Sequence, residues 1–278
     1  SSRTGVRLIG PTPKWARKDG GEAGLHPSNI HDNAYAVGTL DLTGDMPILL
    51  GPDGPSLGGF VCPVTTASAE FWKIGQLQAG DTVRFKLLML DEANALRQKQ
   101  EQFLDELTFT SFEKMNEITY LKQANPASAI LLKSEKGRFP MVVRADGDEN
   151  VLVEYGDMVL DLLLRFQAHL LMEAIKERSD IPVIDLTPGI RSLQVHIDST
   201  KMTLMELCLI IDELNQALPM LEEIEVPSRI VHLPLSWDDS STQLAIERYQ
   251  KNVRPDAPWC PSNIEFIRRM NGLGAIDD

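Results

Sequence analysis

The stretch from residue 19 to residue 60 constrains the fold of this chain more than any other part. Its first fifteen residues crowd together polar groups: Asp19, Glu22, His26, Ser28, Asn29, His31, Asp32 and Asn33. Glycine and proline then recur at close spacing over residues 44–59. Glycine permits close backbone approach and proline fixes φ, so this part must run through tight turns. Two interpretations stay open: turns stabilised by their own Asp and Asn side chains, or rigid loops that present a functional site.

The first ninety residues read as short strands separated by turn signals. Apolar or alternating runs occur at residues 6–9, 35–42, 48–50, 60–66 and 83–89. Many short strands with glycine- and proline-rich turns are typical of a small barrel, so a β-barrel unit is predicted for residues 1–90. Ser28 or Asn29 is expected to cap a turn that begins near Ile30.

Helical spacing begins at Asp91, which is a plausible cap, and continues to residue 107. Residues 91–125 are interpreted as a helical linker. Beyond it the pattern alternates between strands and helices. Strands are predicted at 130–132, 151–155, 181–186, 192–197 and 229–235, and helices at 160–175 and 203–218. From the strand at 151–155 onward the order is β-α-β-β-α-β, that of a ferredoxin-like split βαβ unit, so an α+β domain is predicted for residues 126–235.

Residues 236–278 are predicted to start a third unit, with helices at 240–252 and from 262 to 270. The tetrapeptide Pro-Ser-Asn-Ile occurs at residues 27–30 and again at 261–264. A serine before a helix predicts a helix start in both places, and Ser262 with Glu265 matches a capping box. The repeat is open to two interpretations, a chance match between helix starts or pseudo-symmetry between two related barrels.

Composition excludes several classes of function. A chain of 278 residues has room for about two domains. The net charge of −13 argues against nucleic acids and anionic membranes as partners. No apolar run approaches the ~18 residues of a membrane span. Three widely spaced cysteines and the lack of an apolar segment after Ser1 favour a cytoplasmic location. Cys62 fits a small buried apolar residue better than a nucleophile.

Several catalytic motifs are missing from the sequence. It contains no dinucleotide-binding glycine pattern, no P-loop and no Gly-x-Ser-x-Gly elbow. His26 and His31 lie five residues apart, which is not the spacing of a helical zinc pair, so no bound metal is predicted. No Met-Lys-Met site for biotin attachment is present.

The polar block nevertheless resembles a known family. The run Asp-Gly-Gly-Glu-Ala-Gly-Leu-His-Pro-Ser-Asn-Ile-His-Asp-Asn from residue 19, with Gly-Asp-Met-Pro and Gly-Pro-Asp-Gly-Pro-Ser-Leu-Gly-Gly-Phe after it, is similar to the carboxyltransferase region of urea carboxylases. Urea carboxylase is the biotin-dependent half of urea amidolyases, and its carboxyltransferase region resembles two fused Kip-type proteins. The similarity continues at residues 72–81, 186–193 and 254–273 and so extends over essentially the whole chain.

The resemblance implies an architecture. It points to a cyclophilin-like barrel, a ferredoxin-like domain and the start of a second barrel. The chain begins inside such a region and stops before its last barrel, so we expect a fragment.

The resemblance also implies a half-reaction: transfer of CO₂ from carboxybiotin to a urea nitrogen, which gives allophanate. Biotin would arrive on a separate carrier domain, and ATP and Mg would be used by a separate biotin carboxylase domain. An allophanate hydrolase would act downstream. Alternatives are a guanidine carboxylase, a 5-oxoprolinase-type Kip protein, or a non-catalytic module that inhibits a kinase.

Urea is planar and neutral, with one acceptor oxygen and four N–H donors, so its site needs orienting groups and no protein nucleophile. The predicted catalytic residues are Asn29, His26, Asp32, Asp19 and Glu22. The predicted substrate-binding residues are Asn29, Ser28, Asn263 and Glu265. The predicted biotin-binding residues are Gly54, Ser56, Gly58 and Gly59. For each carboxylate, an Asx turn or an ion pair with Arg3, Arg7 or Arg17 is the alternative interpretation.

Overall fold

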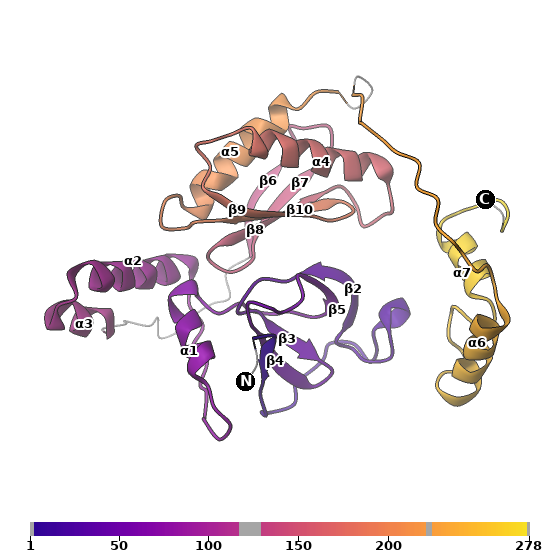
Figure 1. Ribbon diagram of the computed structural model, residues 1–278, viewed down its shortest axis with the longest axis horizontal. Helices are drawn as coiled ribbons and strands as arrows, with labels where there is room; N and C mark the ends of the chain where they lie inside the picture. Colours follow the sequence, from indigo (N-terminus) through magenta and orange to yellow (C-terminus); the bar gives the residue numbers. More distant parts are fainter. Residues whose placement is uncertain (1–2, 117–128, 221–223, 277–278) are drawn as a thin grey trace. The chain divides into compact units, whose positions relative to one another are not determined.

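The computed structural model describes residues 3–116, 129–220 and 224–276, without the side chains of residues 22, 32 and 114–116. The chain divides into two units, Ser1–Glu222 and Glu223–Asp278, and each is taken by itself. Figure 1 shows the elements of both. The strands and helices together give a mixed α+β fold with antiparallel sheets.

Two small antiparallel sheets form the first part of the chain. One has the strand order β1-β4-β3 and the other pairs β2 with β5. The strands are β1 (Gly5–Arg7), β2 (Asn29–Ala34), β3 (Leu40–Thr43), β4 (Met46–Leu50) and β5 (Leu57–Phe60). In the described residues the two sheets do not close into the predicted barrel. The segment that follows β5 is joined to β3 by only two backbone hydrogen bonds among the described residues. Leu42 N–H donates to Val61 O, and Leu40 N–H donates to Val64 O. Pro63 has no N–H, so a regular ladder cannot continue there.

The predicted strand at residues 83–89 is wrong. This segment is irregular, and the side chains of Val83, Phe85 and Leu87 are 37%, 54% and 49% exposed. Its alternation of apolar residues has no partner strand among the described residues. The helical prediction that follows is confirmed by α2 (Leu90–Glu106), which ends at Leu107 with φ 47°. Shorter helical elements are η1 (Gly21–Ala23), η2 (Ser68–Glu70), α1 (Phe71–Gln76) and α3 (Phe109–Asn116).

A five-stranded antiparallel sheet forms the larger layer, in the order β6-β7-β8-β10-β9. Two helices cover one of its faces (Figure 1). The elements are β6 (Ile130–Ser134), β7 (Met141–Ala145), β8 (Asn150–Tyr155), α4 (Leu162–Lys176), β9 (Val183–Pro188), β10 (Ser192–Ile197) and α5 (Leu204–Ala217).

The predicted β-α-β-β-α-β order is therefore wrong, because the chain runs β-β-β-α-β-β-α. The sequence prediction missed β7, which forms a tight hairpin with β8 around Gly147 at φ 77°. It also placed a strand at 229–235, which is irregular and exposed in the structure. Pro227 and Pro234 flank or interrupt that run and cannot donate to a ladder.

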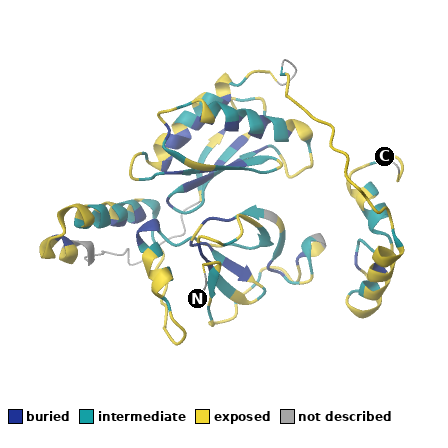
Figure 2. Ribbon diagram, in the orientation of Figure 1, coloured by how far each residue is buried: buried dark blue, intermediate teal, exposed yellow. Residues whose placement is uncertain are grey.

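The core of the first unit lies between this sheet and its helices, as the dark blue segments of Figure 2 show. Val143, Val153 and Val195 are fully buried on the strands, and Leu171 and Leu207 are fully buried on the helices. Both helices begin at a capped residue, which satisfies N–H groups that a helix start leaves open. The Asp161 side chain accepts from Leu163 N–H, and Thr203 with Glu206 forms a capping box.

The second unit contains two helices, α6 (Ser240–Asn252) and α7 (Asn263–Met270), and confirms both predicted helices. Trp259 packs its ring against Tyr249 and Phe266, with ring centroids 5.8 Å and 6.4 Å away. The sequence repeat does not repeat a structure. Ser262 caps α7, whereas residues 27–30 run into strand β2, so the predicted helix start near Ile30 is wrong. Pairing of β2 with β5 decides the difference.

No helix among the described residues is long and apolar enough to cross a membrane.

Candidate functional site

The predicted polar loop folds back on itself before it enters β2. Asp19 Oδ1 accepts a hydrogen bond from Gly21 N–H at 2.9 Å, which closes an Asx-type turn. This bond is the loop-stabilising alternative that was open for Asp19. The side chains of Glu22 and Asp32 lie outside what the structure describes, and their predicted roles stay predictions. His31 lies exposed on β2.

Asn29 lies at the start of β2, and its side chain is oriented by the backbone around it. Its Oδ1 accepts from His26 N–H at 2.9 Å, while its own N–H donates to His26 O at 2.9 Å. An N–H group requires an acceptor, so the carbonyl oxygen of the amide faces His26 and the Nδ2 group faces away. No described residue makes a hydrogen bond to Nδ2. Asn29 thus offers an oriented N–H donor whose oxygen is already occupied.

Two glycines let the backbone approach this side chain closely. A Cβ added at Gly20 would lie 2.8 Å from Asn29 Cβ, and one at Gly24 would lie 2.7 Å from Asn29 Cγ. Any larger residue at either position would displace the amide. The glycines of the Asp-Gly-Gly-Glu-Ala-Gly run therefore have a packing reason that the sequence analysis did not identify.

His26 and Ser28 tie the loop to the turn between β3 and β4. His26 Nδ1 accepts from Ser28 N–H at 3.1 Å and lies 2.9 Å from Ser28 Oγ. The fully buried Ser28 Oγ in turn accepts from Gly44 N–H at 3.1 Å. A neutral His26 ring therefore carries its proton on Nε2, which lies 3.5 Å from Asp45 Oδ1. Asp45 also accepts from the indole N–H of Trp15 at 2.9 Å. Ser28 serves this framework and is not free to bind a substrate by its hydroxyl alone.

Arg17 was considered in the sequence only as an ion-pair partner for the carboxylates. In the structure its guanidinium donates to two carbonyl oxygens instead, Pro27 O and Asn29 O. No residue pattern in the sequence signals this contact, because carbonyl oxygens are present at every position.

The glycine-rich segment comes to lie beside Asn29 because β2 pairs with β5. Asn29 is opposite Phe60 and Asn33 is opposite Gly58. A Cβ at Gly58 would fall 2.4 Å from the Tyr35 ring, so the ring occupies the space that a side chain would need. Tyr35 Oη accepts from Phe60 N–H at 2.9 Å, and burial raises the pKa of Tyr35 to about 12. Gly58 is thereby explained by packing within the chain.

Of the remaining predicted biotin-binding residues, only Ser56 is more accessible than Gly58, since Gly54 and Gly59 are also half-buried. Ser56 is exposed, and its neighbour Leu57 is 45% exposed. Gly54 donates its N–H to Gly51 O at 2.9 Å and lies in the turn that precedes β5. Gly59 has Ile30 O 3.0 Å from the position of an added Cβ.

The carboxyl group of Asp41 lies close enough to the partly buried Cys62 to affect its thiol. Asp41 is 5% exposed on β3, and desolvation raises its carboxyl pKa. Burial, with Asp41 and Asp146 nearby, raises the pKa of Cys62 to about 12. A thiol with so high a pKa is a poor nucleophile at neutral pH, which agrees with the interpretation of Cys62 as a packing residue.

Asn263 and Glu265 belong to the second unit and are described there alone. Ser262 Oγ accepts from Glu265 N–H at 3.2 Å, which is one half of the predicted capping box. The other half is missing because the Glu265 carboxylate binds the Arg268 guanidinium through two hydrogen bonds of 2.6 and 2.8 Å. A guanidinium offers that carboxylate a bidentate, charge-assisted partner, which competes with a single backbone N–H.

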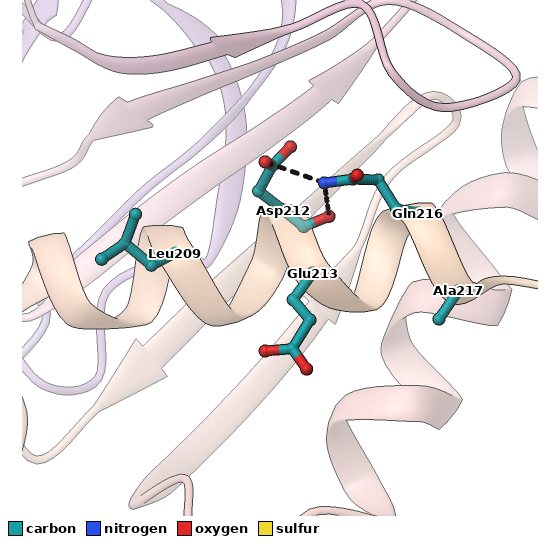
Figure 3. Close-up of a pocket in the computed structure, with 5 residues that line it drawn as sticks. All are labelled: Leu209, Asp212, Glu213, Gln216 and Ala217. Carbon is teal, nitrogen blue, oxygen red and sulfur yellow. Dashed lines mark hydrogen bonds between the residues drawn. The ribbon is translucent and has the colours of Figure 1, made fainter.

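A shallow depression of ≈ 320 Å³ lies on the outer surface of α5. Figure 3 shows that one helix supplies all its lining residues, Leu209, Asp212, Glu213, Gln216 and Ala217. Gln216 Nε2 already donates to Asp212 Oδ2 at 3.0 Å. Because no other element brings polar groups to it, this depression is a less plausible site than the Asn29 loop.

Comparison with known proteins identifies the family. Residues 1–87 match the model "Carboxyltransferase domain, subdomain A and B", and residues 141–277 match "Carboxyltransferase domain, subdomain C and D". The chain belongs to the carboxyltransferase-domain family. The first match contains the polar loop, Asn29 and the glycine-rich strand, and the second contains most of the five-stranded sheet.

Relatives of this carboxyltransferase domain include proteins named urea amidolyase and urea carboxylase. It is 37% identical over 274 residues to urea amidolyase of Saccharomyces cerevisiae, of which it covers 15% while 98% of the chain is aligned. The crystal structure of Kluyveromyces lactis urea carboxylase superposes on the whole chain with a TM-score of 0.72 and 36% identity, and 25% of that chain is covered. A weaker match joins 38% of the chain to 32% of a 5-oxoprolinase component of Haemophilus influenzae, at 27% identity. The chain therefore spans a quarter or less of its urea-processing relatives.

Proposed function

We propose that this carboxyltransferase domain transfers CO₂ from carboxybiotin to a urea nitrogen and so forms allophanate. The observation that carries the proposal is the orientation of the Asn29 amide. His26 N–H holds its oxygen at 2.9 Å, which leaves the Nδ2 group as a neutral donor. Urea has a carbonyl oxygen that needs such a donor, whereas guanidinium presents only N–H groups and a positive charge.

The part of Asn29 in this reaction is to bind and orient the substrate. A hydrogen bond from Nδ2 to the urea oxygen fixes the plane of the molecule and with it the direction of the attacking nitrogen, and correct orientation supplies rate. A buried donor left unpaired costs ~1–3 kcal/mol, which is enough to discriminate between molecules as alike as urea and guanidine. His26 acts here through its backbone N–H. Its ring lies near Asp45 and contacts Ser28 Oγ, which in turn accepts from Gly44 N–H.

Biotin, carried on a separate domain, is the proposed CO₂ donor, and it brings the carboxyl group in activated form. Its neutral, partly apolar ring system suits two exposed residues. These are Ser56, just before the strand paired with Asn29, and Leu57, the first residue of that strand. We therefore assign the turn from Gly54 to Leu57 as the approach for biotin, with Gly59 beside it. ATP and Mg would serve a biotin carboxylase domain elsewhere, and an allophanate hydrolase would consume the product.

Substitution of Asn29 tests the choice of substrate in the full-length protein. Asn29→Asp keeps an acceptor for His26 N–H and the fit against Gly20 and Gly24, and replaces only the Nδ2 donor. We expect kcat/KM for urea to fall by about 10- to 100-fold, the equivalent of one lost hydrogen bond to a buried group, while the preference shifts toward guanidine. Asn29→Ala should lose most urea turnover.

The measurement is kcat/KM for urea and for guanidine, with carboxybiotin-dependent turnover as the readout. An unchanged urea-to-guanidine ratio in Asn29→Asp would mean that Asn29 only stabilises its loop. If the unmodified protein acted on guanidine or 5-oxoproline and not on urea, the proposal that urea is the substrate would be wrong.

The docking assignment has its own test at Ser56. Ser56→Trp should block carboxyl transfer and leave ATP-dependent carboxylation of biotin unchanged. Gly58→Val, although suggested by the glycine pattern, is a poor test because its side chain would collide with the Tyr35 ring. Equal loss of both half-reactions in Ser56→Trp would contradict a local role for this turn.

A further inference from the structure

The guanidinium of Arg17 holds the backbone on both sides of Ser28. Its Nε donates to Pro27 O at 2.9 Å, and its Nη2 donates to Asn29 O. A guanidinium is a rigid fork of five donors, so one side chain can fix two carbonyl groups at a set separation. The two bonds are made by a residue ten to twelve positions earlier in the chain, and they tie the end of the polar loop to its beginning.

The other contacts of Asn29 orient its side chain only relative to its immediate neighbours. The pair of hydrogen bonds with the His26 backbone closes a small ring within the loop. Gly20 and Gly24 pack against the amide from the same loop. Pairing with Phe60 on β5 holds the Asn29 backbone from one side. The Arg17 contact ties the same backbone to a residue that precedes the polar loop.

We propose that Arg17 is a positioning residue for substrate recognition: by clamping Pro27 O and Asn29 O, it sets the direction of the Asn29 amide donor. This inference rests on the proposed function, because it gives Arg17 its effect through contact between Asn29 and urea. Arg17 itself touches no substrate in this scheme. A purely structural role would predict that loss of Arg17 lowers turnover of every substrate equally.

The first test compares Arg17→Gln, Arg17→Lys and the control Arg7→Gln in the full-length protein. Arg7 is an exposed residue of β1, outside the loop. We expect Arg17→Gln to lower kcat/KM for urea by about 10- to 100-fold, as a small misplacement of an orienting group does. Guanidine turnover should fall less, because guanidine has no oxygen for the amide to bind. Arg17→Lys keeps the charge but cannot hold both carbonyl groups. Its kcat/KM for urea should therefore lie between those of the unmodified protein and Arg17→Gln. Equal loss for both substrates would overturn the proposal.

The second test is a double-mutant cycle with Asn29→Ala. If Arg17 acts through the Asn29 side chain, Arg17→Gln should have little further effect on urea turnover once that side chain is removed. Independent, multiplying losses would show that Arg17 acts by another route and would overturn the assignment.

A third measurement does not depend on turnover. The two NMR signals of the Asn29 Nδ2H₂ group are assigned by their loss in Asn29→Asp. They should move in Arg17→Gln, move less in Arg17→Lys and stay in place in Arg7→Gln. Unchanged signals in Arg17→Gln would refute the positioning role even if the enzyme is active. Shifted signals in a protein that does not carboxylate urea would uphold the positioning and refute the proposed function.

Discussion

The five-stranded layer and the first ninety residues are built on different physical principles. The layer buries a continuous apolar cluster in which Val143, Val153, Leu171 and Leu207 are fully inaccessible. The first ninety residues bury few apolar side chains: Tyr35, Ala36, Leu42, Leu49, Leu50 and Ala69. Their loops are held instead by glycine packing and by hydrogen bonds to Asn29, Ser28 and Asp45. The apolar core and the proposed recognition loop therefore lie in different parts of this chain.

The largest expected effect is on the apolar layer. Leu207→Ala removes a side chain that is fully buried on α5 and should lower the free energy of unfolding by about 2–5 kcal/mol. Leu209→Ala is the matched control, two residues along the same helix with a side chain that is 66% exposed, and it should change stability by less than about 0.5 kcal/mol. Urea denaturation followed by circular dichroism measures both.

If Leu207→Ala and Leu209→Ala lowered the free energy of unfolding by similar amounts, α5 would not be packed on the sheet. The contrast between the apolar layer and the first ninety residues would then fail. Neither change should alter the ratio of urea to guanidine turnover, since neither residue belongs to the Asn29 loop or to the strands that hold it.

A smaller effect is expected where the glycine-rich strand meets Tyr35. Gly58→Ala places a methyl group 2.4 Å from the Tyr35 ring, and overpacking of this kind costs about 1–3 kcal/mol. Gly75→Ala is the control, because no atom lies within 4 Å of the added Cβ and the residue is in helix α1. Alanine should be neutral or slightly stabilising there, since it loses less backbone entropy than glycine. Thermal unfolding of the two variants gives the measurement.

If Gly58→Ala is as stable as the unmodified chain, the Tyr35 ring does not occupy the space beside β5. The explanation of Gly58 by internal packing would then fail, and a ligand would again be the best reason for that glycine.

The smallest effect concerns the junction between the two regions, where the turn after β7 meets Thr65. Asp146 accepts from Gln194 Nε2 at 2.6 Å and from Thr65 Oγ1 at 3.4 Å, and desolvation raises its pKa above the ordinary value. A raised carboxyl pKa means that the folded state binds the proton more tightly than the unfolded state. The free energy of unfolding should therefore fall as pH rises from about 4, the unfolded-state pKa, through the raised folded-state pKa.

Asp146→Asn removes the charge and can still serve both neighbours, with its oxygen toward Gln194 and its amide toward Thr65. The decline in stability above pH ~4 should be shallower in this variant. Denaturant midpoints across the range from acidic to neutral pH measure it, and an identical pH profile in the two proteins would show that Asp146 does not titrate in this window. Asp148 and Asp41 have pKa values raised in the same direction, so part of the decline should persist.

Much of the helical structure could be predicted from the sequence because its causes are local. The helices α2, α4, α5, α6 and α7 were all predicted within a few residues of their observed bounds. Caps such as Asp161 and Thr203 lie next to the N–H groups that they satisfy, and the apolar spacing lies within one segment. The polar loop was likewise identified as the unusual part of the chain from residue types alone.

The strands were harder to predict because a strand needs a partner that the local sequence does not show. Residues 83–89 and 229–235 alternate as strands do, yet both are irregular and exposed in the described structure. Residues 141–145 were passed over and form β7 in the middle of a sheet. The site shows the same limit. Asn29, His26 and Ser28 were identified as candidates, whereas the carbonyl contacts of Arg17 and the packing of Gly20 and Gly24 were not.

The sequence by itself determined the family, the helices and the loop in which Asn29 lies, since each depends on residues that are close together in the chain. Only the tertiary structure decided that β2 lies beside β5, that Tyr35 fills the space over Gly58, and that Arg17 clamps the Asn29 backbone. These contacts join residues up to thirty-one positions apart, as Asn29 and Phe60 are. These contacts form only when the chain has folded. The identity of a residue does not show which group its backbone carbonyl will bind or which side chain will pack against a glycine.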